Sequence, residues 1–176
     1  MLKLNSIILI IIFSSCARAQ ELKTADDIDI NRYIGKWYAI TSLPQFFTRK
    51  CLGQSADYQI INESAISVLN TCYKKNKTTT IEGQAVVINF QTKAELEVSF
   101  NNFFTRLFRV KGDYNIIKID ENYQYVMVGS RDRKSLWIMA RNKSMPEIKL
   151  KEYIEIAKEQ GFPIERLVRS KYEKKH

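Results

Sequence analysis

Histidine and cysteine are the side chains most often used as bases, nucleophiles and metal ligands, and this chain has few of them. It contains one histidine, His176, in a charged C-terminal stretch, and three cysteines. A hydrolytic triad needs a histidine or an equivalent base beside its nucleophile, and a metal centre needs several ligands close together. The sequence therefore predicts no catalytic residue, no metal site and no cofactor.

The first twenty residues, MLKLNSIILIIIFSSCARAQ, have the pattern of a bacterial-type export signal. An early lysine precedes an apolar run from Ile7 to Phe13, which is too short to cross a bilayer as a helix. Two cleavage sites compete. IFSSC resembles a bacterial lipobox, which would make residues 1–15 the signal and Cys16 a lipidated first residue. ARA before Gln20 suits ordinary signal peptidase, which would end the signal at residue 19 and leave a soluble protein.

The cysteine count favours the lipidated form. In an oxidising compartment Cys51 and Cys72 can form a disulfide, which leaves Cys16 as the odd cysteine. Lipidation gives that third cysteine a role. We therefore expect a lipid anchor on Cys16 that attaches the protein to a membrane.

Length and charge restrict the partner. The chain has 176 residues with 45% hydrophobic content, which suits one globular domain with a packed core. Its net charge of +9 and pI of about 9.4 favour an anionic partner. Export removes most of the case for nucleic acid, so we expect a phosphate-bearing or carboxylate-bearing partner outside the cytoplasm.

Short segments rich in β-branched and aromatic residues fill the chain between residues 35 and 141, and turn residues separate them. A meander of eight such strands protects its edges by closing into a barrel. The predicted fold class is all-β, an eight-stranded antiparallel up-and-down barrel. The expected strands span residues 36–42, 54–61, 65–72, 81–89, 94–100, 111–119, 124–130 and 134–141.

A helical pattern follows the strands in SMPEIKLKEYIEIAKEQGFP. We expect Ser144 as N-cap with Glu147 three residues on, Pro146 in the first turn, and a stop at Gly161 and Pro163. A short extra strand in IERLVR and a polar tail over residues 171–176 come next. The expected apolar stripe of the helix is Ile148, Tyr153, Ile154 and Ala157.

Alternate loops of an up-and-down barrel lie at opposite ends, and the basic residues gather in the loops after the first, third, fifth and seventh strands. The long loop TSLPQFFTRKC at this end offers Phe46 and Phe47 as an apolar lid over a cavity. A basic rim around an apolar interior suits an amphiphile, with its tail inside and its anionic head at the rim. The expected rim residues are Arg106, Arg131, Arg133 and Lys134.

GKWY at the start of the first strand, and VMVGSRDRKSLWIMAR about a hundred residues later with one helix after it, resemble the lipocalins. The similarity is specifically to the bacterial outer-membrane lipocalins related to apolipoprotein D, and it runs from about Asp29 to Arg169. It implies a lipocalin domain over residues 29–170, an N-terminal linker over residues 16–28 and the polar tail.

The resemblance implies structural roles for three residues. In lipocalins a short helical turn, here expected in DINRYI, crosses the closed end of the barrel and leads into the first strand. Gly35 then permits a sharp bend, Trp37 packs under the barrel floor, and Arg141 stacks on Trp37 and bonds to nearby carbonyls. Cys51 and Cys72 flank a predicted hairpin, so a disulfide across the mouth is geometrically plausible.

The resemblance also implies binding, storage or transport of fatty acids or lysophospholipids, for membrane maintenance under stress. The expected location is the outer membrane, facing the periplasm, with a soluble periplasmic or secreted form as the alternative, and the expected state is a monomer or a homodimer. One alternation of the strands should line the cavity, together with loop phenylalanines. The expected lining is Tyr38, Ile40, Phe46, Phe47, Tyr58, Val68, Val87, Val98, Phe103, Phe104, Tyr114, Ile116, Tyr125, Met127 and Ile138.

Three other classes compete with a lipid carrier. A lipocalin-type enzyme could act on a bound lipid through a free Cys51 or Cys72. An oligonucleotide-binding barrel would explain basic charge and aromatics, but the export signal and the strand count oppose it. A structural envelope protein with a barrel filled by side chains also agrees with the pattern.

Overall fold

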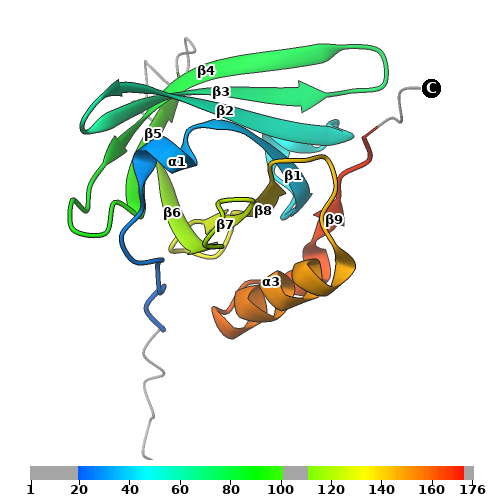
Figure 1. Ribbon diagram of the computed structural model, residues 1–176. Helices are drawn as coiled ribbons and strands as arrows, with labels where there is room; N and C mark the ends of the chain where they lie inside the picture. Colours follow the sequence, from blue (N-terminus) through cyan, green and yellow to red (C-terminus); the bar gives the residue numbers. More distant parts are fainter. Residues whose placement is uncertain (1–19, 101–110, 173–176) are drawn as a thin grey trace, which may run out of the picture.

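The structure, a computed structural model, describes residues 20–100 and 111–172. Eight strands wind into an antiparallel barrel, in which each strand pairs with the next and β1 pairs with both β2 and β8 (Figure 1). The predicted all-β, up-and-down barrel is therefore confirmed. The barrel strands are β1 (Gly35–Ser42), β2 (Gly53–Asn62), β3 (Ala65–Tyr73), β4 (Thr78–Val87), β5 (Glu95–Phe100), β6 (Lys111–Ile119), β7 (Tyr125–Gly129) and β8 (Leu136–Ala140).

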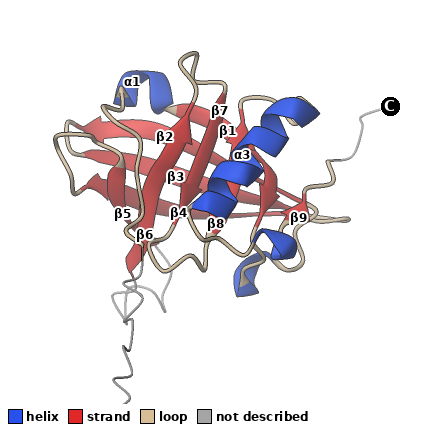
Figure 2. Cartoon of the chain, turned by 90° about the horizontal axis from the view of Figure 1, so that it is seen from below, coloured by secondary structure: helices blue, strands red, loops and turns tan. Residues whose placement is uncertain are grey.

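Alternation along the strands divides the buried side chains into two apolar clusters. The inner cluster fills the barrel and includes Trp37, Tyr58 and Leu96. The outer cluster lies between the barrel wall and helix α3 (Glu147–Glu159), which Figure 2 shows against the outside of the sheet. The wall under α3 is thus apolar on both faces.

Helix α3 begins two residues later than the sequence pattern predicts. Its N-cap is Pro146, which has an extended backbone, rather than Ser144. Met145 is buried in the outer cluster, so the chain stays extended until it has passed this contact. The buried stripe consequently falls on Leu150, Tyr153 and Ala157, whereas Ile148 is 82% exposed.

After α3 the chain returns to the barrel. A 3-10 turn, η2 (Ile164–Arg166), precedes the two-residue strand β9 (Val168–Arg169), which pairs antiparallel with the end of β1. The short strand expected in IERLVR is therefore confirmed only for its last two residues. No helix within the described ranges is long and apolar enough to span a bilayer.

The closed end of the barrel is crossed by α1 (Ile30–Tyr33). Asp29 caps this turn, because its Oδ1 accepts from the backbone N–H of Asn31 at 2.9 Å. Gly35 follows with φ +89°, a left-handed conformation that favours glycine, and the chain bends there into β1. Trp37 is then fully buried beneath α1, and its Nε1 donates to the carbonyl of Tyr33 at 2.8 Å.

Candidate functional site

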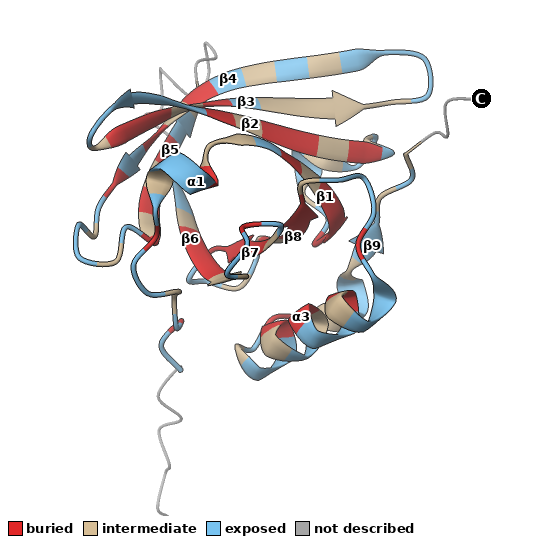
Figure 3. Ribbon diagram, viewed as in Figure 1, coloured by how far each residue is buried: buried red, intermediate tan, exposed pale blue. Residues whose placement is uncertain are grey.

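The barrel interior is the candidate site, and its open end lies where β1, β3, β5 and β7 finish. In Figure 3 the first half of β4, near this end, is exposed or intermediate, whereas buried residues recur towards its finish at the closed end. The interior therefore has a packed floor and a more accessible upper part. Six expected lining residues face this interior, namely Tyr58, Val68, Val87, Val98, Tyr114 and Ile116.

Five other expected lining residues face outwards, so their placement in the cavity was wrong. Ile40, Met127 and Ile138 are buried in the outer cluster, and Tyr125 packs against it. Tyr38 contacts Tyr172 on the outside, with ring centroids 5.8 Å apart. A one-residue error in register exchanges the two faces of a strand, and strands that are apolar on both faces give no warning of it.

The interior residues that the sequence did not predict include the sequence neighbours of those five. On β1, the assignment of Trp37 to the floor already implies that Tyr38 points outwards, because successive side chains alternate. No comparable signal exists on β7 and β8, whose two faces are both apolar. The inward residues that were not predicted include Ala39, Val126, Val128, Trp137 and Met139 on β1, β7 and β8, and Ala56, Ile66, Ala85 and Leu96 on β2, β3, β4 and β5.

Three tyrosines form the lower part of the interior. The hydroxyls of Tyr33 and Tyr114 lie 2.5 Å apart, and those of Tyr58 and Tyr114 lie 2.8 Å apart. Burial raises the pKa of Tyr58 to about 12 and raises the pKa of Tyr33 and of Tyr114 well above the usual value. The floor therefore carries neutral phenols that hydrogen-bond to one another, and offers no charge to a ligand.

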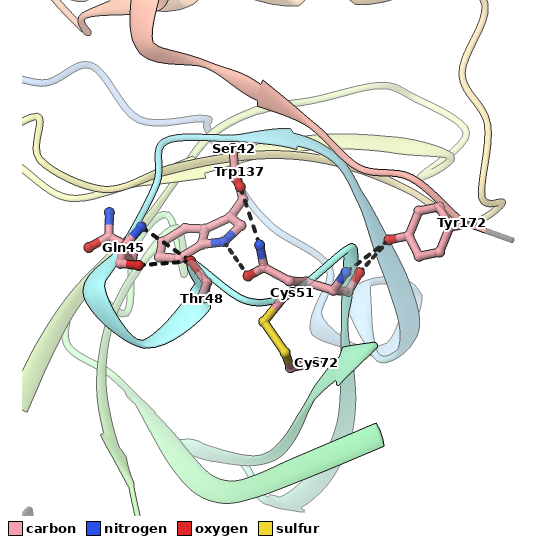
Figure 4. The surroundings of a disulfide bond; sticks show 8 residues. Ser42, Gln45, Thr48, Cys51, Cys72, Trp137 and Tyr172 are labelled. Carbon is pink, nitrogen blue, oxygen red and sulfur yellow. Dashed lines mark hydrogen bonds between the residues drawn. A yellow bond between two sulfur atoms is a disulfide. The ribbon is translucent and has the colours of Figure 1, made fainter. Parts of the chain in front are cut away.

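Polar side chains mark the upper part of the interior. The Nε1 of Trp137 donates to Oε1 of Gln54 at 3.3 Å, and Nε2 of Gln54 donates to Oγ of Ser42 at 3.4 Å. Figure 4 shows Trp137 and Ser42 beside the Cys51–Cys72 disulfide, whose Cα atoms are 5.3 Å apart. Trp137 is only partly buried although it packs against the inner cluster. A ligand entering from the open end would meet this group first.

The predicted phenylalanine lid is not formed. Phe46 and Phe47 lie in the 3-10 turn η1 (Phe46–Thr48), where they are 83% and 69% exposed. Side chains this exposed point into solvent and do not cover the interior. Phe103, Phe104 and the rim residue Arg106 lie outside the described residues.

Arg131 and Arg133 turn away from the mouth of the barrel. The prediction that these two arginines belong to the basic rim was therefore wrong. Arg131 forms an ion pair with Asp113 at 2.7 Å and another with Glu95, both on outward faces of the wall. Arg133 donates from Nε to the carbonyl of Gln160, at the C-terminal end of α3, at 3.0 Å. Carboxylates and helix C-terminal carbonyls attract a guanidinium more strongly than an open mouth does. Lys134 is exposed, and its Nζ lies 3.4 Å from Oδ2 of Asp132.

A lipocalin-type enzyme would need Cys51 or Cys72 as a free thiol, but these two cysteines form a disulfide with each other. In the oxidised protein neither sulfur is available as a nucleophile. Within the described ranges no three His, Cys, Asp or Glu side chains gather as metal ligands. The groups that face a ligand in the barrel are therefore apolar side chains, phenols, an amide and an indole.

The chain matches the model of the Lipocalin-like domain over residues 28–172. It is 34% identical over 152 residues to the outer membrane lipoprotein Blc of Vibrio cholerae, covering 85% of each chain. It is 32% identical over 129 residues to apolipoprotein D of Macaca fascicularis, covering 69% of this chain and 65% of that one. The structure superposes on insecticyanin of Manduca sexta with a TM-score of 0.69 at 14% identity, over 89% and 87% of the two chains, which shows the shared fold. The chain belongs to the lipocalin family.

Proposed function

We propose that this protein binds, stores or transports an amphiphilic lipid, either a fatty acid or a lysophospholipid, for membrane maintenance in a bacterial-type envelope. Lipocalins are generally binding and transport proteins, and the similarity to Blc favours a lipid ligand. The observation that carries the proposal is the division of the barrel interior into an uncharged lower part, where apolar side chains surround three neutral phenols, and a polar upper part.

The ligand's orientation follows from that division. The acyl chain lies against the inward apolar residues of the wall, such as Val68 and Val98, where burial of each CH₂ contributes about 0.8 kcal/mol. The head group lies at the level of Gln54 and Trp137, which supply an amide and an indole N–H. The reverse orientation would bury a charged head among neutral phenols and is disfavoured.

The location belongs to the same proposal. Cys16 and both cleavage sites lie outside the described residues, so lipidation of Cys16 stays a prediction from the sequence. The name of the Vibrio relative, an outer membrane lipoprotein, supports an anchored envelope protein. Native mass spectrometry of protein from its own membrane fraction tests this, since acyl chains on Cys16 add mass, whereas cleavage after Ala19 leaves an unmodified chain that begins at Gln20.

The two tryptophans allow a direct binding test. Trp137 lines the upper interior, whereas Trp37 is fully buried at the floor. A fatty acid or lysophospholipid brominated on the acyl carbons next to its head group should quench the fluorescence of Trp137 in a saturable titration. Trp137→Phe should remove most of the quenching while extraction still recovers bound lipid. Absence of saturable quenching in the unmodified chain, together with an empty barrel in native mass spectrometry, would refute the proposal.

A barrel filled by side chains remains the second candidate, because the tyrosine floor occupies part of the interior. The two functions make different predictions for Val68→Trp, which adds volume on the inner wall. A lipid carrier should lose affinity for long acyl chains before it loses affinity for short ones. A filled barrel should simply be destabilised by the overpacking and should bind no lipid in either form.

A further inference from the structure

Two phenylalanines stand in solvent at the open end of the barrel. Phe46 is 83% exposed and Phe47 is 69% exposed, and they are adjacent in η1. A neighbouring pair of exposed aromatic rings is unfavourable in water and commonly marks an interaction surface. The lipid-binding interior does not use these side chains, so they need another explanation.

The fold holds this turn in place. The Nε2 of Gln45 donates to the carbonyl of Lys134 at 2.8 Å, and Thr48 donates its backbone N–H to the carbonyl of Gln45 at 3.1 Å. The Cys51–Cys72 disulfide ties the end of the same loop to β3, and Leu52 donates to the carbonyl of Tyr73 at 2.7 Å. The exposure of the two rings is thus a property of a fixed turn.

Basic residues follow the two rings in the same loop and also occupy the turn that the disulfide joins to that loop. The guanidinium carbon of Arg49 lies 5.1 Å from the ring centroid of Phe46. The disulfide also brings the β1–β2 loop together with the β3–β4 turn, which Lys74 closes by donating to the carbonyl of Lys77 at 3.0 Å. Neither connection contains an acidic residue. We call the following group the mouth patch: Phe46, Phe47, Arg49, Lys50, Lys74, Lys75 and Lys77.

We propose that the mouth patch docks the open end of the barrel onto an anionic lipid surface. Aromatic side chains flanked by lysine and arginine suit the boundary between head groups and acyl chains, because the rings enter the apolar layer and the cations contact phosphates. Charge complementarity selects the lipid surface as occupant, since the patch carries five basic residues and no acidic one. Docking in this orientation lets a lipid move between bilayer and barrel without crossing water. The inference goes beyond the proposed lipid binding and does not depend on the anchor at Cys16.

Sedimentation with vesicles tests the docking. The full chain carrying Cys16→Ala, which has no anchor, is mixed with vesicles of phosphatidylglycerol and phosphatidylcholine or of phosphatidylcholine alone. We expect binding to the anionic vesicles that weakens as salt is added, and much less binding to the neutral ones. Phe46→Ser with Phe47→Ser, and separately Lys74→Glu with Lys75→Glu and Lys77→Glu, should each weaken vesicle binding about tenfold or more.

Matched controls lie elsewhere on the surface. Phe90, 64% exposed in the β4–β5 connection at the closed end, provides the control Phe90→Ser. The exposed Lys93, Lys151 and Lys158 provide a triple charge reversal of equal size. Neither control should change vesicle binding by more than about twofold. Thermal unfolding of every variant shows whether a loss reflects misfolding.

Several results would overturn the docking proposal. Equal losses in the patch and control variants, equal binding to neutral and anionic vesicles, or no vesicle binding would each do so. A concentration-dependent dimer in sedimentation velocity that disappears with Phe46→Ser and Phe47→Ser would assign the patch to a second copy of the chain. The Trp137 titration on the same variants separates the two proposals, because mouth-patch variants should retain lipid binding in solution while losing vesicle binding.

Discussion

The guanidinium carbon of Arg141 lies 3.8 Å from the ring centroid of Trp37. The same guanidinium donates five hydrogen bonds to carbonyls of α1, the start of β1 and the β6–β7 connection. One side chain therefore joins three segments at the closed end, and its planar face covers the indole. The carbonyls belong to Arg32, Tyr33, Ile34, Lys36 and Tyr123.

Arg141→Lys should lower the free energy of unfolding by about 2–3 kcal/mol, because an ammonium cannot reach these carbonyls together and has no flat face to stack. Urea unfolding measures the loss. Arg169→Lys is the control, since Arg169 pairs with Glu147 on the surface and should change stability little. Similar losses in both variants would contradict the role given to Arg141.

Removal of the disulfide should destabilise the protein and release η1. The two cysteines are 21 residues apart, and closing a loop of this size contributes about 3 kcal/mol in the chain-entropy description. Cys51→Ser with Cys72→Ser should lower the melting temperature by roughly 6–12 °C. Adding a reductant should reproduce this shift in the unmodified chain and have no effect on the double variant. If reductant did not change the melting temperature of the unmodified chain, the disulfide would not stabilise the fold.

Alkaline pH should destabilise the barrel through its tyrosine floor. Burial raises the pKa of Tyr58 to about 12 from its usual 10.0. Between these values the unfolded chain releases the phenolic proton and the folded protein retains it, so the free energy of unfolding falls as pH rises from 10 to 12. Urea unfolding at pH 8 and pH 11 measures the fall. Tyr58→Phe should make the fall smaller, and Tyr38→Phe on the outer face should leave it unchanged.

Leu150→Ala and Ile148→Ala test the placement of α3 on the barrel. Leu150 is fully buried in the outer cluster, so its truncation should cost about 2–4 kcal/mol. Ile148 is exposed, and its truncation should change the free energy of unfolding by less than about 0.5 kcal/mol. A larger loss of unfolding free energy for Ile148→Ala would mean that Ile148 is buried, as the apolar stripe predicted from the sequence requires.

Arg131→Glu should lower the free energy of unfolding and should not change the preference between anionic and neutral lipids. The new carboxylate would lie beside Asp113 and Glu95, so we expect a loss of about 1–2 kcal/mol in urea unfolding. Affinity for anionic and neutral lipids in the Trp137 titration should fall equally or remain unchanged. Lys134→Glu is the control on the same turn. If either variant lost affinity for anionic lipids and kept its affinity for neutral lipids, the residue changed in that variant would contact the head group after all.

Local chemistry predicted much of this protein. Turn residues between β-branched segments predict the order of the eight strands, and the barrel follows because a sequential meander has edges to close. The bend at Gly35, which the resemblance to the lipocalins implies, depends only on the neighbouring backbone and is confirmed by its left-handed φ. The upper polar group could not be predicted, because Gln54 and Trp137 are 83 residues apart and meet only in the closed barrel.

The faces of β7 and β8 and the destinations of Arg131 and Arg133 were decided by tertiary structure alone. Helix α3 covers the outside of the wall, so both faces of β7 and β8 are apolar and alternation does not distinguish them. A bulge between Ala39 and Thr41 then shifts the register of β1. The arginines bond to carboxylates and carbonyls brought beside them by folding. Periodicity in a sequence gives the spacing of side chains, and only packing against a partner element determines which side faces the interior.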